Sequence, residues 1–176
     1  KASKVRARVY TSLLYRHWNA WQGGKRKHVL AMPLSGGKVV DLTPGRLDVP
    51  PFSLGGPDDF VISPDSKEVA YAANVDSDQA LSTNTEIYVA PISGGEPKKV
   101  SNSPGGDLSP AYSPDGKYLA WRSQARAGYE SDKWRLTVLE RATGKISYIS
   151  DAIDQPVESF TWSPDSGRLV SVTASP

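Results

Sequence analysis

Ser63-Pro64-Asp65-Ser66 occurs again as Ser113-Pro114-Asp115-Gly116 and as Ser163-Pro164-Asp165-Ser166, at an offset of 50 residues each time. Apolar segments follow the copies in the same phase: Val69-Ala70-Tyr71, Leu119-Ala120-Trp121 and Leu169-Val170-Ser171. A fixed period of this size is typical of stacked supersecondary units. The repeat therefore predicts the architecture before any single residue is considered.

Each unit reads as four short β-strands. Proline presets φ near −65°, and Asp followed by Gly or Ser completes a tight turn, so each Ser-Pro-Asp joins two strands. A second turn follows at Ser93-Gly94-Gly95 and at Thr143-Gly144-Lys145. No segment has a convincing helical period over 11 or more residues. The pattern predicts an all-β fold of the β-propeller type, with a four-stranded antiparallel blade in each 50-residue unit.

The period divides the chain into four segments. Residues 55–101 and 104–150 are predicted to form complete blades, 8–43 the last three strands of an incomplete blade, and 155–175 the first two strands of another. Residues 44–56 form a Pro- and Gly-rich insertion. Propellers close with roughly 4–8 blades, so we expect a piece of a longer protein. Self-association through open blade edges is the alternative.

The composition is that of an ordinary globular protein. The chain is 38% hydrophobic and 23% charged, with a net charge of +2 and no cysteine. The sequence has no apolar run of about 18 residues, so it predicts no membrane helix. The small net charge does not predict a nucleic-acid partner. The absence of cysteine excludes disulfides and thiolate metal sites. It does not decide between the cytoplasm and a periplasmic or secreted location. We favour a periplasmic or secreted location.

The chain shows no catalytic motif. Gly-x-Ser-x-Gly does not occur, and the only histidines are His17 and His28. Asp58-Asp59 could suggest calcium, but turn hydrogen bonding accounts better for their repeat phase. The basic run Lys25-Arg26-Lys27-His28 is read either as an anion patch or as a solvated hairpin tip. We expect no catalytic residue, cofactor or metal site within this chain.

The candidate binding residues lie on the long connections between the second and third strands of each blade. In a propeller these connections share one rim with those between blades, and the tight turns share the other. Function is usually carried on such loops. The connection over 123–133 offers four side chains that could grip the polar end of a ligand: Arg126, Tyr129, Glu130 and Asp132. The alternative is a solvated charged loop.

Several motifs resemble the propeller of the prolyl oligopeptidase family, over about residues 8–175. They are closest to its dipeptidyl aminopeptidase/acylaminoacyl peptidase branch, which includes dipeptidyl peptidase V-like enzymes. The resemblance is carried by Leu14-Tyr15-Arg16-His17-Trp18-Asn19-Ala20-Trp21, by Ala127-Gly128-Tyr129-Glu130-Ser131-Asp132, and by Ser-Pro-Asp-Gly with Lys117-Tyr118-Leu119-Ala120-Trp121. Periplasmic TolB-like propellers share the Ser-Pro-Asp repeat.

The resemblance implies a propeller segment that gates and helps to bind short peptides for a separate α/β-hydrolase domain. That domain carries the Ser-Asp-His triad in the family, so this chain alone is expected to be inactive. Some members bind the peptide's amino group through a Glu pair, which is absent here, and Glu130 is nominated in its place. A TolB-like protein-binding module without peptidase activity is the alternative. A Gly-x-Ser-x-Gly motif in the parent protein would separate the two.

Overall fold

The structure is a computed structural model that describes residues 4–11 and 13–174. Residues 12 and 175, which the predicted segments 8–43 and 155–175 include, lie outside the described residues. Every regular element of the described chain is a β-strand, which confirms the all-β prediction. The strands are β1 (Arg16–His17), β2 (Ala20–Trp21), β3 (Leu30–Ala31), β4 (Val40–Asp41), β5 (Phe60–Ile62), β6 (Glu68–Ala73), β7 (Glu86–Pro91), β8 (Lys98–Lys99), β9 (Asp107–Tyr112), β10 (Tyr118–Ser123), β11 (Arg135–Glu140), β12 (Lys145–Tyr148), β13 (Val157–Trp162) and β14 (Leu169–Thr173).

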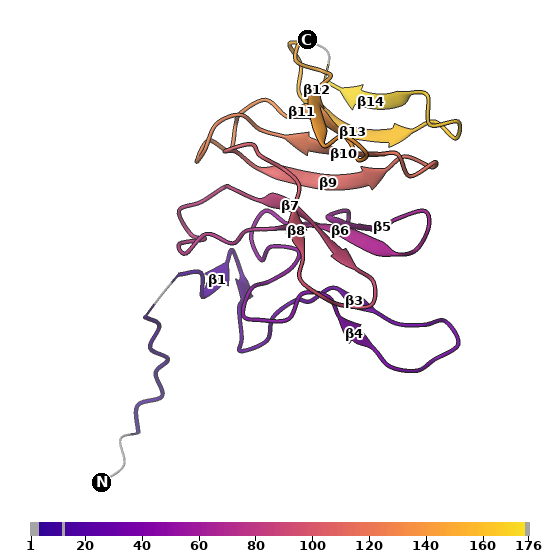
Figure 1. Ribbon diagram of the computed structural model, residues 1–176. Coiled ribbons are helices and arrows are strands. Elements are labelled where there is room, and N and C mark those ends of the chain that lie inside the picture. Colours follow the sequence, from indigo (N-terminus) through magenta and orange to yellow (C-terminus); the bar gives the residue numbers. More distant parts are fainter. Residues whose placement is uncertain (1–3, 12, 175–176) are drawn as a thin grey trace.

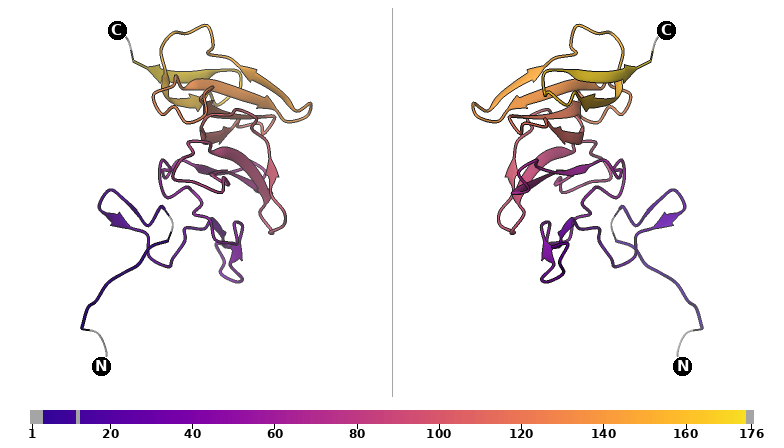
Figure 2. Two further views of the ribbon diagram at one scale, coloured as in Figure 1. Left: turned by 90° about the vertical axis from the view of Figure 1, so that its left-hand side faces the viewer. Right: turned by 90° about the vertical axis from the view of Figure 1, so that its right-hand side faces the viewer.

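The strands form five antiparallel sheets. Two are four-stranded, in the orders β5-β6-β7-β8 and β12-β11-β10-β9, and three are the hairpins β1-β2, β3-β4 and β13-β14. The predicted segment 8–43 contains the hairpins β1-β2 and β3-β4. Figure 1 shows the sheets stacked in chain order, from β3–β4 at one end to β13–β14 at the other. The side views in Figure 2 show the same stack, with β1–β2 set to one side.

Strand β6 consists almost entirely of apolar residues, and its place in the stack explains why. Successive side chains of a strand point to opposite faces. Val69, Tyr71 and Ala73 pack toward the β3–β4 hairpin. Ala70 and Ala72 pack on the opposite face, against the next sheet. Both faces are buried, so alternation with polar residues is lost.

Strand β10 continues this pattern one sheet further along the stack. Leu119 and Trp121 join the core shared with β6 and β7. Ala120 faces the other way, onto the core shared with β13 and β14. The small alanine lets the neighbouring sheet approach, and the large tryptophan fills the opposite interface.

The three Ser-Pro-Asp segments form the predicted tight turns. The serine carbonyl accepts a hydrogen bond from the fourth residue in each: from Ser66 N at 2.8 Å, from Gly116 N at 2.8 Å and from Ser166 N at 2.9 Å. The serine hydroxyl donates to the aspartate, as Ser113 does to Asp115 at 2.7 Å. This bond is the main cause that lowers the pKa of Asp115 to about 2. The Ser-Pro-Asp triplets are therefore scaffold.

Hydrogen bonds also join neighbouring sheets. Ser109 N donates to Asp59 Oδ1 at 2.8 Å, and Trp162 Nε1 donates to the Ala111 carbonyl at 3.1 Å. Asp115 N in the second Ser-Pro-Asp turn donates to Ser166 Oγ in the third, at 3.0 Å. These contacts fix the sheets relative to one another, and with them the long connections at one end of the strands.

Candidate functional site

Four connections that are distant in sequence enclose one hollow of about 230 Å³. They are the segments 42–59, 74–85, 100–106 and 124–134, which all leave the strands at the end opposite to the Ser-Pro-Asp turns. The hollow is lined by Leu54, Thr83, Thr85, Gly106, Leu108, Gln124, Glu130 and Trp134. The long connections thus come together, as we expected of a propeller rim.

Gln124 holds one wall of this hollow. Its side chain is almost completely buried, and Nε2 donates to the carbonyls of Glu130 at 3.0 Å and Asp132 at 2.9 Å. Because one amide group binds two carbonyls of the same loop, the loop is closed on itself. Gly128 N donates to Thr83 Oγ1 at 3.0 Å, which ties this loop to the connection before it.

Asp132 is part of the same scaffold. Its Oδ2 accepts hydrogen bonds from Ala125 N at 2.7 Å and Arg126 N at 2.9 Å. The Arg126 guanidinium lies 4.0 Å from Oδ1. The carboxylate predicted to touch a ligand is thus occupied by backbone groups of its own loop.

Glu130 is the carboxylate that stays available. The residue is exposed and lines the hollow. Its carboxylate makes no hydrogen bond or ion pair with any residue that the structure describes. Arg126 and Tyr129 lie beside it on the loop surface, with the guanidinium 5.5 Å from the ring centroid. The four predicted residues therefore lie on one loop, and their side chains differ in the partners that they have within it.

Trp134 supplies the aromatic wall, and Arg122 lies 5.1 Å from the centroid of its ring. The Arg122 guanidinium donates to Ser109 Oγ at 3.1 Å and to the Glu158 carbonyl at 2.8 Å. Burial lowers the pKa of Arg122, and the charge of Asp59 opposes this change. The ring is therefore held from behind by a half-buried cation.

Sequence reasoning missed Thr83, Thr85, Gln124 and Trp134, which also line the hollow. Gln124 stood within a loop already singled out, yet nothing in its neighbours marks it as buried. Trp134 directly precedes β11 and reads equally well as a core residue. These side chains line the same hollow only because the four connections pack together.

The other sequence candidates have structural partners. Asp59 is buried, and its carboxylate accepts from Gly56 N at 2.6 Å as well as from Ser109 N. This supports loop hydrogen bonding over calcium. Burial raises the pKa of Asp59. Within residues 4–11 and 13–174, no cluster of three or more His, Asp or Glu side chains could hold a metal ion.

The basic run Lys25–His28 packs against the insertion. Arg26 Nε donates to the Arg46 carbonyl at 2.9 Å, and Lys27 N donates to Asp48 Oδ1 at 2.8 Å. His28 Nδ1 lies 2.6 Å from Asp41 Oδ2. The ring of His17 is edge-on to Phe52 at 6.1 Å. In the described part of the chain, no helix is long and apolar enough to cross a membrane.

Gly105 allows two connections to approach at the hollow. A Cβ atom at this position would lie 2.7 Å from the Gln124 carbonyl oxygen. We expect Gly105→Ala to lower the free energy of unfolding by about 2 kcal/mol, because backbone must move to admit the methyl group. Urea unfolding measures this. Gly24→Ala is the control, since its Cβ would meet no atom within 4 Å. Equal stability of the two variants would contradict the packing described here.

Known proteins resemble this chain over most of its length. No family model matches it. It is 36% identical over 171 residues to dipeptidyl-peptidase 5 of Porphyromonas gingivalis, covering 93% of this chain and 25% of that protein. It is 33% identical over 192 residues to dipeptidyl-peptidase 5 of Arthroderma otae, covering 96% of this chain and 26% of that protein. The chain thus spans about a quarter of the length of these curated relatives.

Solved structures give a likeness in fold. The crystal structure of the tricorn protease matches 78% of this chain and 12% of its own, with a TM-score of 0.54 and 14% identity. TolB from Acinetobacter baumannii matches 80% of this chain and 30% of its own, with a TM-score of 0.49 and 16% identity. The tricorn match extends over more than one sheet of the stack, and at this identity it supports a common architecture alone.

Proposed function

Because the chain belongs to the prolyl oligopeptidase family, we propose that it is the β-propeller segment that gates and helps to bind short peptides for a separate α/β-hydrolase domain. Relatives named dipeptidyl-peptidase 5, of which it spans 25% and 26%, leave room for such a domain. The name of these relatives favours the peptidase function over a TolB-like binding module.

In this proposal the two four-stranded sheets are successive blades. Sheet β5–β8 is one blade and sheet β9–β12 the next, and β13–β14 begins another. The bond between Asp59 and Ser109 joins positions 50 residues apart, and that between Asp115 and Ser166 joins positions 51 apart. Contacts at nearly one repeat length between adjacent sheets support a 50-residue unit.

The observation that carries the binding proposal is the unpaired carboxylate of Glu130 at the edge of the loop-lined hollow. A carboxylate facing a ligand ammonium forms a charge-assisted hydrogen bond, about twice as strong as a neutral one. Trp134 adds an aromatic face, which attracts cations. Arg126 and Tyr129 lie on the same loop, with the guanidinium 5.5 Å from the ring centroid, and Asp132 holds the loop in shape. We therefore place the amino end of a short peptide at Glu130.

The test is Glu130→Gln in a complete peptidase that contains this chain. We expect KM for a chromogenic dipeptide substrate with a free amino end to rise about tenfold or more, since a hydrogen bond to a charged group is lost. The same substrate with a blocked amino end should show no change. Glu96→Gln is the matched control, because Glu96 lies in the β7–β8 turn at the other end of the strands. An unaltered KM for the free-amino substrate would contradict the assignment.

A further inference from the structure

A second hollow lies between residues 42–49 and the sheet β5–β8, where it reaches β6, β7 and the turn before β8. Its volume is about 440 Å³, which is within the range of about 300–1,000 Å³ for small-molecule sites. All of its lining residues lie between Leu42 and Pro97, so both walls come from the interior of the chain. Most of the lining is apolar: Leu42, Pro44, Leu47, Val49, Ala73, Val75 and Pro97.

Tyr71 of β6 brings a hydroxyl group to this apolar lining. The residue is only 3% exposed. Its hydroxyl makes no hydrogen bond with any residue that the structure describes. It is also not among the fully enclosed polar atoms that lack a partner, so the hollow that Tyr71 lines reaches it. A largely buried hydroxyl without a partner costs free energy, and a ligand that pairs with it recovers that cost.

Tyr88 of β7 places a second hydroxyl beside the first. The two tyrosines are directly opposite each other on neighbouring strands, and their rings stack at 5.9 Å. Burial, with a smaller contribution from Tyr88, raises the pKa of Tyr71 to about 12. Burial also raises the pKa of Tyr88. Both phenols therefore keep their protons at neutral pH and can donate them. A carbonyl oxygen has two lone pairs, so one acceptor can serve both hydroxyls.

The charges around the hollow favour a neutral ligand. Among the described residues, the charged side chains that line it are Arg46 on one wall and Glu96 on the other. Both are exposed, and they have opposite signs, so the hollow offers no net charge to an ion. Water is a poor occupant of the space beside Tyr71, because a held water molecule needs about two to four polar partners and most of the lining is apolar.

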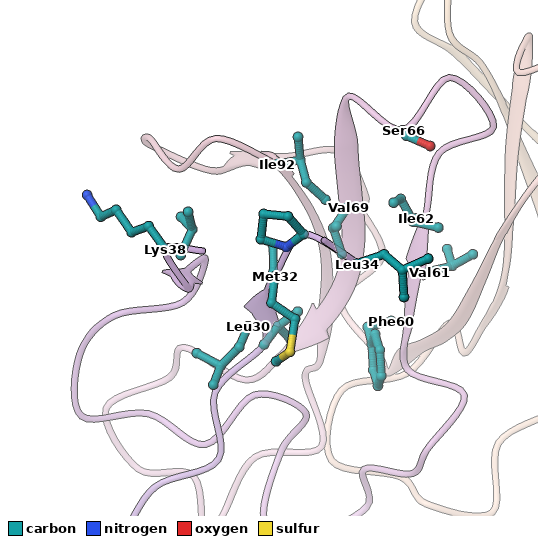
Figure 3. A pocket seen from close by; sticks show the side chains of 14 residues that line it. Leu30, Met32, Leu34, Lys38, Phe60, Val61, Ile62, Ser66, Val69 and Ile92 are labelled. Carbon is teal, nitrogen blue, oxygen red and sulfur yellow. The ribbon is translucent and has the colours of Figure 1, made fainter. Parts of the chain in front are cut away.

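A larger hollow of about 850 Å³, between the β3–β4 hairpin and β5–β6, has different chemistry. Figure 3 shows its lining, in which Leu30, Met32 and Phe60 are apolar and Lys38 and Ser66 carry the polar groups. Both polar side chains are exposed, so water satisfies them. That hollow therefore has no polar side chain that needs a ligand, in contrast to the hollow beside Tyr71.

We propose that the hollow beside Tyr71 and Tyr88 binds a small neutral carbonyl compound with an aromatic or branched apolar part. The apolar part packs between residues 42–49 and the two tyrosine rings. The carbonyl oxygen accepts a hydrogen bond from the Tyr71 hydroxyl and lies beside that of Tyr88. This site is separate from the hollow at Glu130, since the two share no lining residue.

A titration of the intact protein with 4-phenyl-2-butanone, followed by saturation-transfer NMR, tests the proposal without any peptidase assay. Its outcome is therefore independent of the proposed function. We expect a Kd of about 1 mM or tighter, as is usual for a ligand of this size. Tyr71→Phe removes one hydroxyl and keeps the ring, so it should weaken binding about fivefold. Tyr118→Phe is the matched control, because Tyr118 does not line the hollow, and it should leave Kd unchanged.

The anionic probe 3-phenylpropionate has the same ring and a carboxylate in place of the ketone, and it should bind at least about fivefold more weakly than the ketone, since a charge must leave water. Equal Kd values for Tyr71→Phe and Tyr118→Phe would overturn the proposal, as would an acid that binds more tightly than the ketone. If the ketone does not bind at all, the hollow is closed to ligands and the proposal is wrong.

Discussion

Trp121→Ala is expected to lower the free energy of unfolding by about 3–5 kcal/mol, the range for truncating a large buried aromatic side chain. Trp121 is 1% exposed and packs in the core between the two four-stranded sheets. Its Nε1 donates to Asp107 Oδ1 at 2.9 Å. The substitution therefore opens a cavity and leaves a buried carboxylate without its donor. Urea denaturation followed by circular dichroism gives the free energy.

Two further variants make this measurement decisive. Trp18→Ala is the control, because Trp18 is 82% exposed, and we expect a change below about 0.5 kcal/mol. Trp121→Phe keeps most of the apolar contact and loses the donor, so a cost of about 1–3 kcal/mol is expected. The stability of Trp121→Phe can still be measured if Trp121→Ala does not fold. A loss below about 1 kcal/mol for Trp121→Ala would contradict a shared core between the sheets.

The second large effect is a pH dependence of stability that originates at Asp107. This side chain is fully buried, and burial raises its pKa to about 7, while Ser123, Trp121 and Ser101 lower it. Oδ2 of Asp107 has no hydrogen-bond partner among the described residues, so neither Ser123 nor Ser101 donates to it. The charge of Glu86 also raises the pKa of Asp107, and the Asp107 carboxylate raises the pKa of Lys99. The neutral carboxylic acid is thus the form that suits the site.

The direction follows from the raised pKa. An acid whose pKa is higher in the folded protein stabilises it fully below the unfolded value of 3.8, and this stability is lost as the pH rises through about 7. From about pH 4.5 to about pH 8 we expect a loss of about 3 kcal/mol from this group. Asp107→Asn should remove the loss. Aspartates with lowered pKa values, such as Asp115, act only below this window.

The measurement is urea unfolding of both proteins across this pH range. We expect the wild type to lose stability relative to Asp107→Asn as the pH rises, and the variant to be more stable at about pH 8. Parallel curves for the two proteins would mean that Asp107 has the same pKa in the folded and unfolded chain. Burying this carboxyl group without a compensating partner would then cost no free energy.

Much of the fold could be predicted from the sequence because its strongest signals are local. The turn residues of Ser63-Pro64-Asp65-Ser66 and its copies act within four positions, and the apolar runs after them are as long as one strand. The family resemblance, now confirmed by relatives at 36% and 33% identity, rests on the same motifs. The pairing of β1 with β2 and of β3 with β4 could not be read from the sequence, since it depends on which strand edges find partners.

The candidate site was predictable only in outline. Loop position nominated Arg126, Tyr129, Glu130 and Asp132 together, although the carboxylate of Asp132 binds backbone amides and that of Glu130 does not. Both residues are acidic and lie two positions apart, so their sequence cannot separate these tasks. The role of Gln124 is equally hidden, because its two acceptors are carbonyls presented by the folded loop. Such tasks depend on backbone geometry that residue types alone do not encode.

We propose that the long-connection rim of this chain receives the peptide in a peptidase that contains it. A crystal structure of the complete protein with a substrate-derived inhibitor tests it most directly. We expect the inhibitor's amino end to lie within hydrogen-bond distance of the Glu130 carboxylate, in the hollow walled by Gln124 and Trp134. An inhibitor bound at the opposite end, beside the turns at Ser66, Gly116 and Ser166, or away from this chain altogether, would contradict it.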